Sequence, residues 1–135
     1  MIKKTIKYID YDGNQREEEF RFNLSKAELT EMQLSATGGL SNLLTRLVQE
    51  KNAPEIIKIL KEIILKSYGE KSDDGKYFRK SEEISKAFSE TEAYSEIFMS
   101  IASDPDAAIE FVQGILPAEI KEELQKNQKA QDAQN

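Results

Sequence analysis

The chain has 135 residues, the size of one domain, and its 19 basic and 25 acidic side chains give a net charge of −6. It contains neither cysteine nor histidine, which excludes disulfides, thiolate nucleophiles, histidine-ligated metals and a Ser-His triad. The acidic balance disfavours nucleic acid and anionic membrane surfaces as partners. Because no apolar run approaches the roughly 20 residues of a membrane span, we expect a soluble, intracellular protein.

Residues 1–24 are predicted to form a β-hairpin. Asp12-Gly13-Asn14 is a turn signal, because Gly and Asn tolerate the positive φ that hairpin turns need. A three-residue loop there would place Ile6 opposite Phe20 and Lys7 opposite Glu19. An isolated hairpin is marginally stable in water, so its apolar face must pack on other elements. That face carries Ile2, Ile6, Tyr8, Phe20, Phe22 and Leu24.

The chain after the hairpin is predicted to be helical. Ser25 and Glu28 fit a capping box that opens a helix running to about Leu34. A second helix is expected over roughly residues 41–51, and a third from about residue 54 to residue 68. Their apolar spacing predicts buried stripes. These comprise Leu43, Leu44, Leu47 and Val48 in the second helix and Ile56, Ile57, Leu60, Ile63 and Ile64 in the third.

Residues 70–80 are predicted to be a polar loop, after which the chain returns to helix. Four further helices are expected, each opened by a polar cap or a proline. They run from Ser81 to Phe88, from a Ser89 capping box to Ala102, from Asp104 to Gly114, and from Pro117 onward. Ile120 and Leu124 are the apolar anchors of the last one.

The expected fold is therefore α+β and predominantly α-helical, with an N-terminal β-hairpin packed on a bundle of about five to six helices. Residues 1–117 are predicted to be a single globular domain, with the hairpin at 1–24 and helices at 25–117. Residues 118–135 are predicted to hold a C-terminal helix and a polar, disordered tail, because no core former follows residue 124.

No residue pattern points to catalysis or to a bound metal or cofactor. Asp10, Asp12 and Asn14 have the first spacings of a calcium loop, but Gln15 and Arg21 stand where that loop needs Gly and Glu. The three residues are better explained as turn residues. We expect a protein that is not an enzyme, with no catalytic residue, no cofactor and no metal.

Four apolar residues are candidates for contact with a partner. Tyr77 and Phe78 lie in the predicted polar loop, and Ile115 and Leu116 lie between two predicted helices. Apolar side chains that a domain leaves exposed often mark a binding surface. We expect Tyr77→Ala with Phe78→Ala, or Ile115→Asp, to weaken association with a client or a second copy while leaving the fold cooperative.

Residues 4–14 and 18–29 resemble the tail assembly chaperones of long-tailed bacteriophages, the siphophages. The block from Ile63 to Pro117 resembles them too, so the similarity covers nearly all of residues 1–117. Within this block the resemblance includes Tyr68-Gly69-Glu70-Lys71-Ser72, Phe88-Ser89-Glu90-Thr91-Glu92-Ala93-Tyr94 and Gly114-Ile115-Leu116-Pro117.

The resemblance implies an assembly factor of the infected bacterial cytoplasm that is absent from the mature virion. Such a chaperone binds and solubilises the long helical tape measure protein and helps the tail tube protein polymerise around it. The implied partners are these two proteins, further copies of the chain as a homo-oligomer, and a frameshift-extended form of itself, with no nucleic acid and no membrane. An apolar groove between helices is the expected surface for a helical client.

Two other functions remain open from the sequence. One is a structural minor tail or connector component that stays in the virion. The other is an acidic regulator that mimics nucleic acid. The second would need regularly spaced carboxylates along one surface, whereas acids and bases are interspersed here, as in residues 80–86.

Overall fold

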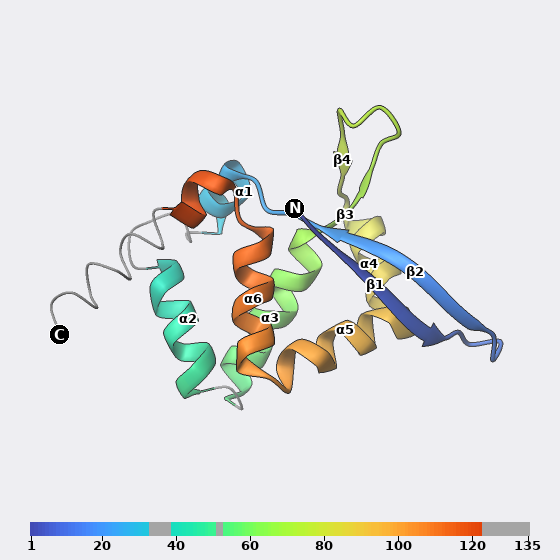
Figure 1. Cartoon of the computed structure of the whole chain (residues 1–135), viewed down its shortest axis with the longest axis horizontal. Helices are drawn as coiled ribbons and strands as arrows, with labels where there is room; N and C mark the ends of the chain where they lie inside the picture. The colour runs from blue at the N-terminus through green and yellow to red at the C-terminus, as the bar shows by residue number, and fades with distance from the viewer. Residues whose placement is uncertain (33–38, 51–52, 123–135) are drawn as a thin grey trace, which may run out of the picture.

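A β-hairpin, three helices, a second β-hairpin and three more helices follow one another in the computed structural model, which describes residues 1–32, 39–50 and 53–122 (Figure 1). The strands are β1 (Ile2–Ile9), β2 (Gln15–Phe22), β3 (Tyr68–Lys71) and β4 (Phe78–Arg79). The helices are α1 (Lys26–Glu31), α2 (Gly39–Gln49), α3 (Pro54–Ser67), α4 (Glu82–Ser89), α5 (Glu92–Ala102) and α6 (Pro105–Ile115), and a further helical segment begins at residue 118. The predicted fold class, α+β and mostly helical, is confirmed. The predicted helix end at Leu34, the anchor Leu124 and the polar tail lie outside the described residues.

All four strands belong to one antiparallel sheet in the order β1-β2-β3-β4. The start of β3 pairs with the C-terminal end of β2, through Arg21↔Gly69 and Phe22↔Tyr68 only. The prediction of a polar loop at 70–80 is wrong, because β3 and β4 pair with each other across a turn. Both hairpins extend beyond the helical body, β1–β2 to one side and β3–β4 upward (Figure 1).

The predicted register of the first hairpin is wrong by two residues. Ile6 lies opposite Glu18 and Lys7 lies opposite Glu17. Since side chains alternate with a period of two, a shift by two residues leaves each side chain on its predicted face. The predicted apolar face accordingly packs on the helices, with Phe22 buried completely.

The turn of this hairpin explains the register. Asp10 accepts hydrogen bonds on Oδ1 from the backbone N–H groups of Asp12 and Asn14, both at 2.9 Å. The N–H of Asp10 also donates to the carbonyl of Asn14 at 2.9 Å, and Gly13 takes a positive φ of 82°. The loop therefore spans five residues instead of three, because the Asp10 side chain stabilises the longer turn.

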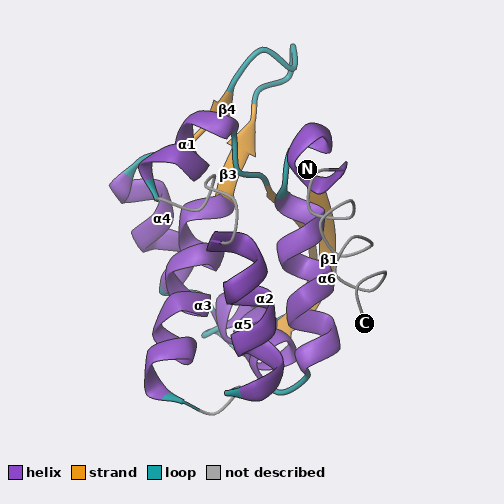
Figure 2. Cartoon of the chain, turned by 90° about the vertical axis from the view of Figure 1, so that its left-hand side faces the viewer, coloured by secondary structure: helices purple, strands orange, loops and turns teal. Residues whose placement is uncertain are grey.

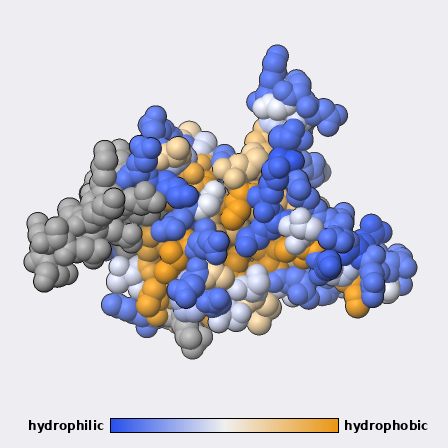
Figure 3. All heavy atoms as spheres, in the orientation of Figure 1, coloured by the Kyte–Doolittle hydropathy of each residue, from blue (hydrophilic) through white to orange (hydrophobic). Residues whose placement is uncertain are grey.

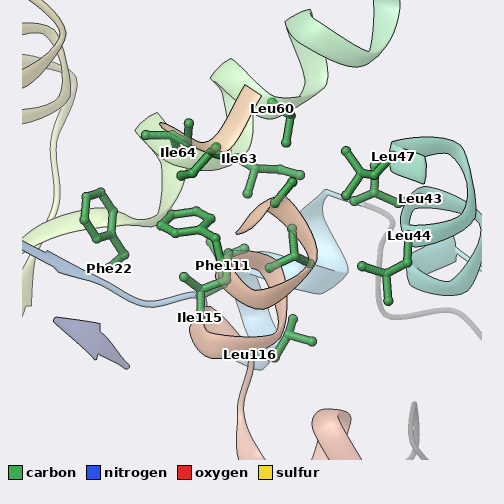
Figure 4. Packing of buried hydrophobic residues seen from close by; sticks show 14 of the residues in the cluster. Phe22, Leu43, Leu44, Leu47, Leu60, Ile63, Ile64, Phe111, Ile115 and Leu116 are labelled. Carbon is green, nitrogen blue, oxygen red and sulfur yellow. The ribbon is translucent and has the colours of Figure 1, made fainter. Parts of the chain in front are cut away.

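The core forms where the helices meet the C-terminal end of β2 (Figure 4). Leu43, Leu44 and Leu47 of α2 are buried as predicted. Val48 and Ile57 are not, with 54% and 37% of their surface exposed, so their prediction as core residues is wrong. Each follows a buried residue, Leu47 or Ile56. Because successive helical residues point about 100° apart, Val48 and Ile57 are turned away from the core.

Polar caps start the helices largely as predicted. Ser25 and Glu28 form both halves of a capping box, and Ser81 and Asp104 cap α4 and α6. The predicted Ser89 cap is wrong, because Ser89 is the last residue of α4 and the hydroxyl of Thr91 caps α5 instead. The break between α4 and α5 therefore lies at Glu90 and Thr91, two residues after the predicted cap.

Helix α6 runs one residue past its predicted end at Gly114. A Cβ atom on Gly114 would lie 2.8 Å from Cδ1 of Ile2, too close for an ordinary contact. Glycine thus lets the start of β1 approach α6 closely. The next residue, Ile115, is buried completely, and its carbonyl accepts a hydrogen bond from the N–H of Leu24 at 2.9 Å.

Ile115→Asp is expected to unfold the chain, in contrast to the sequence-based expectation of a cooperative fold. The substitution places an unpaired carboxylate in the core, and the free energy of unfolding should fall by at least about 3 kcal/mol. Urea denaturation followed by circular dichroism measures the change. Tyr77→Asp is the control, because Tyr77 is 58% exposed and should cost less than about 1 kcal/mol. Equal stability of the two variants would contradict this placement of Ile115.

Candidate partner-binding groove

A groove of about 800 Å³ lies between α3 and α4, with the C-terminal end of α1 beside it. Figure 2 shows these three helices on one side of the molecule. The residues lining the groove are Glu28, Met32, Lys61, Glu62, Leu65, Lys66, Tyr68, Lys80, Ser81, Glu82, Ser85, Lys86 and Ser89. This set divides into an apolar floor, a wall of small residues and a charged rim.

The apolar part of the groove consists of Met32, Leu65 and Tyr68, all half-buried. The ring of Tyr68 stacks on that of Phe88, with centroids 4.0 Å apart and planes 14° from parallel. Burial raises the pKa of the Tyr68 hydroxyl, and the nearby carboxylate of Glu70 raises it further, so this hydroxyl stays neutral. The floor therefore presents uncharged, mostly apolar surface held in place by the core beneath it.

Helix α4 contributes small side chains to one wall. Ser81, Ser85 and Ser89 are four residues apart, so they lie along one face of the helix. The hydroxyl of Ser85 donates to the carbonyl of Leu65 at 3.3 Å, and that of Ser89 donates to the carbonyl of Lys86 at 2.6 Å. Because these hydroxyls are short and bonded to backbone, they leave room above the floor.

Charged side chains of both signs surround the groove. Lys61, Glu62 and Lys66 come from α3, and Glu82 and Lys86 come from α4. None of the five makes an ion pair with another described residue. Their charges are therefore free to meet complementary charges on a partner.

Lys80 ties the elements around the groove together. Its Nζ lies 2.6 Å from Oε2 of Glu28 and donates to the carbonyl of Asn23, also at 2.6 Å. The other oxygen of Glu28 accepts the N–H of Ser25 in the capping box of α1 at 3.0 Å. One ammonium thus connects the end of β2, the first turn of α1 and the start of α4.

The protonation of this pair follows from its half-buried position. Burial lowers the pKa of Lys80, because it disfavours the charged ammonium, and the neighbouring Lys66 lowers it further; the bond to Glu28 opposes both. Burial alone would raise the pKa of Glu28, but the hydrogen bonds from Lys80 and Ser25 outweigh it and hold the pKa below its ordinary value. Glu28 is therefore ionised at neutral pH.

Glu28→Gln is expected to lower the free energy of unfolding by about 1–3 kcal/mol at neutral pH, since it leaves Lys80 without its anion. Because the pKa of Glu28 is lower in the folded chain, its contribution is present above its ordinary pKa and is lost as the pH falls through the folded value. Urea denaturation between about pH 5 and pH 3 should therefore show a steeper loss of stability for the unmodified chain than for Glu28→Gln. Glu96→Gln, an exposed site on α5, is the matched control. Parallel curves for the unmodified chain and Glu28→Gln would count against this role.

One of the four sequence-predicted contact residues, Phe78, lies near the groove. Phe78 is half-buried, with its ring over Gly69 and its centroid 5.5 Å from Nζ of Lys80. Tyr77 is exposed on the β3–β4 hairpin, and the guanidinium of Arg79 lies 5.4 Å from its ring centroid. Their role in partner binding stays a prediction.

Ile115 and Leu116 do not fit the prediction that they contact a partner. Ile115 is fully buried and Leu116 is 5% exposed, and both belong to the hydrophobic core (Figure 4). The predicted gap between two helices is filled, because α6 continues through Ile115 and packs it against the rest of the core. The folded chain therefore does not offer these side chains to a partner.

Sequence reasoning did not identify the groove. Leu65 and Tyr68 fall within the third predicted helix, over residues 54–68, and neither of them was predicted to have a role in binding. The row of serines at 81, 85 and 89 was the available signal, since small residues at helical spacing leave space on a helix face. The serine row does not show which element lies opposite α4. The structure shows that this element is α3.

The described residues contain neither a membrane-spanning helix nor a cluster of metal ligands. None of the described helices is long and apolar enough to cross a membrane. Within residues 1–32, 39–50 and 53–122, no group of three or more acidic side chains is placed to hold a metal ion.

Comparison with known proteins identifies the family. No curated protein and no solved structure matches the chain. One protein family, described as phage tail assembly chaperone, matches residues 1–135, which is the whole chain. The match extends the resemblance beyond residue 117 and includes every residue of the groove. The chain therefore belongs to the phage tail assembly chaperone family.

Proposed function

We propose that the chain binds and solubilises the tape measure protein and helps the tail tube protein polymerise around it. The observation that carries this proposal is the groove between α3 and α4, which has an apolar floor and an unpaired charged rim. Chaperones of this family are generally non-catalytic and act by binding, so a surface for a client is the feature that the function requires. The client surface is therefore assigned to the groove.

The groove suits one face of an amphipathic helix. A helix placed in a groove buries its apolar stripe and keeps its charged flanks at the rim. Met32, Leu65 and Tyr68 would meet the stripe, and the lysines and glutamates of the rim would meet charges of the opposite sign. A long helical tape measure protein would present such stripes along its length.

The small floor also bears on how the client is held. Three half-buried apolar residues support only a weak contact in each copy, and a client held by many copies gains strength by avidity. Weak individual contacts leave the chaperone displaceable when the tube protein assembles. This favours action as a homo-oligomer. We further propose that a frameshift-extended form takes part, and that the chain acts in the cytoplasm of a bacterium infected by a siphophage.

Ser85→Arg tests the groove directly. The long cationic side chain would fill the space above Leu65, and the fraction of co-expressed tape measure protein that stays soluble should fall at least fivefold. Ala87→Arg is the matched control, because it adds the same residue to the exposed side of α4. Quantitative gels of the soluble fraction measure the difference. Equal protection by both variants would sink the assignment of the client to this groove.

A chaperone that acts only during assembly should be missing from finished particles. Mass spectrometry of purified virions is expected to detect the tape measure and tail tube proteins without this chain. A stoichiometric amount of the chain in the virion would instead indicate a structural minor tail or connector component. The infected-cell lysate, where the chain should be abundant, provides the positive control.

A further inference from the structure

The β1–β2 hairpin has two strand edges without a neighbour in the described part of the chain. β1 is the first strand of the sheet, so its outer edge pairs with no other described strand. β2 pairs with β3 only through Arg21 and Phe22, which leaves residues 15–20 without a strand on that side. Residues 15–19 are all exposed, and the far end of the hairpin extends beyond the helices (Figure 1).

The backbone of both edges is directed outward. Asp10 donates its N–H to Asn14, so the hydrogen-bonded pairs of this antiparallel ladder involve the even-numbered residues. The N–H and C=O groups of Lys3, Thr5, Lys7 and Ile9 therefore point away from β2. On β2 the odd-numbered residues point away from β1, as the bond from the N–H of Asn23 to the carbonyl of Ser67 shows. Two rows of backbone groups that pair with no other described strand result, a ready template for another strand.

The two edges carry opposite charges. β1 contains Lys3, Lys4 and Lys7 and no acidic residue. β2 contains the run 17–19 of three glutamates and two arginines, Arg16 and Arg21, which form ion pairs with Asp10 and Glu19. The three lysines and Glu17 make no ion pair with another described residue. At the far ends of the hairpin, hydrophilic side chains dominate the surface in Figure 3. The edges are thus complementary in charge as well as in hydrogen bonding.

Charge decides which edges can meet. Two copies joined through β1 and β1 would bring lysines together, and two joined through β2 and β2 would bring glutamates together. Like charges on adjacent strands are destabilising, so both symmetric pairings are disfavoured. Edge lysines commonly prevent pairing with the same edge of another copy, and here the acidic edge supplies the complement.

We propose that the chain associates with further copies of itself head to tail, the basic edge of β1 in one copy adding to the acidic edge of β2 in the next. The contact joins two different surfaces, so each copy keeps one edge free after the first pairing. Such contacts produce a ring if the rotation closes and an open spiral if it does not. This inference rests on the proposed function in that it names the contact by which many copies would surround one client.

Charge reversal tests the pairing. The first variant, Lys3→Glu with Lys7→Glu, makes both edges acidic, and the second, Glu17→Lys with Glu19→Lys, makes both basic. In sedimentation velocity, the unmodified chain is expected to gain mass with rising concentration, and each variant should associate at least tenfold more weakly. Lys58→Glu with Lys76→Glu is the matched control, because both residues are exposed and lie outside the two edges. A strictly monomeric unmodified chain would overturn the proposal.

Mixing the two charge-reversal variants distinguishes loss of a specific contact between edges from loss of folding. The two variants together should form mixed oligomers, because each acidic edge again finds a basic one. A variant with all four substitutions should associate by itself, since its two edges have exchanged charge. Failure of both the mixture and the fourfold variant to assemble, with native circular dichroism spectra, would rule out head-to-tail pairing of these edges.

Thr5→Pro tests the backbone contact without changing charge. The N–H of Thr5 points away from β2, so proline should spare the hairpin and block the added strand, while Thr5→Ala should associate normally. Normal association of Thr5→Pro would contradict the proposal. The sedimentation experiment uses the purified chain without tape measure protein, so it does not depend on the groove. Ser85→Arg alters the groove and leaves both strand edges unchanged. A failed self-association and a failed client groove are therefore distinguished by separate measurements.

Discussion

Phe22 is the side chain on which the other parts of the structure converge. It is completely buried at the end of β2, and its ring lies 5.2 Å from that of Phe111 in α6, 5.9 Å from Phe88 in α4 and 5.9 Å from Tyr68 in β3. Aromatic pairs at such distances add stabilisation beyond the area they bury. The sheet, two helices and the second hairpin are thus held at one point.

The groove depends on the same cluster. Tyr68 contributes its outer side to the groove floor, while its ring stacks on Phe88 beneath. Lys80 then fixes the start of α4 to the end of β2 and to Glu28 of α1. Because the floor is one side of the core, the proposed client surface and the core share residues.

The molecule separates its two proposed contacts in space. The groove lies between α3 and α4, whereas the charged edges lie along the β1–β2 hairpin, which extends beyond the helices (Figure 1). Copies joined through their hairpins would therefore leave their grooves free. Opposite charges on two edges of one hairpin favour growth in one direction, which suits the proposed covering of a client longer than one copy.

The sequence by itself determined the helices, the caps at Ser25, Ser81 and Asp104, and the apolar face of the first hairpin, because these depend on neighbours within a few residues. It also carried the family resemblance. Only the tertiary structure decided the pairing of β3 with β2 and the groove. Ile115 shows the reason. Local spacing placed it in a gap between helices, whereas its burial depends on contacts with residues far away in the chain.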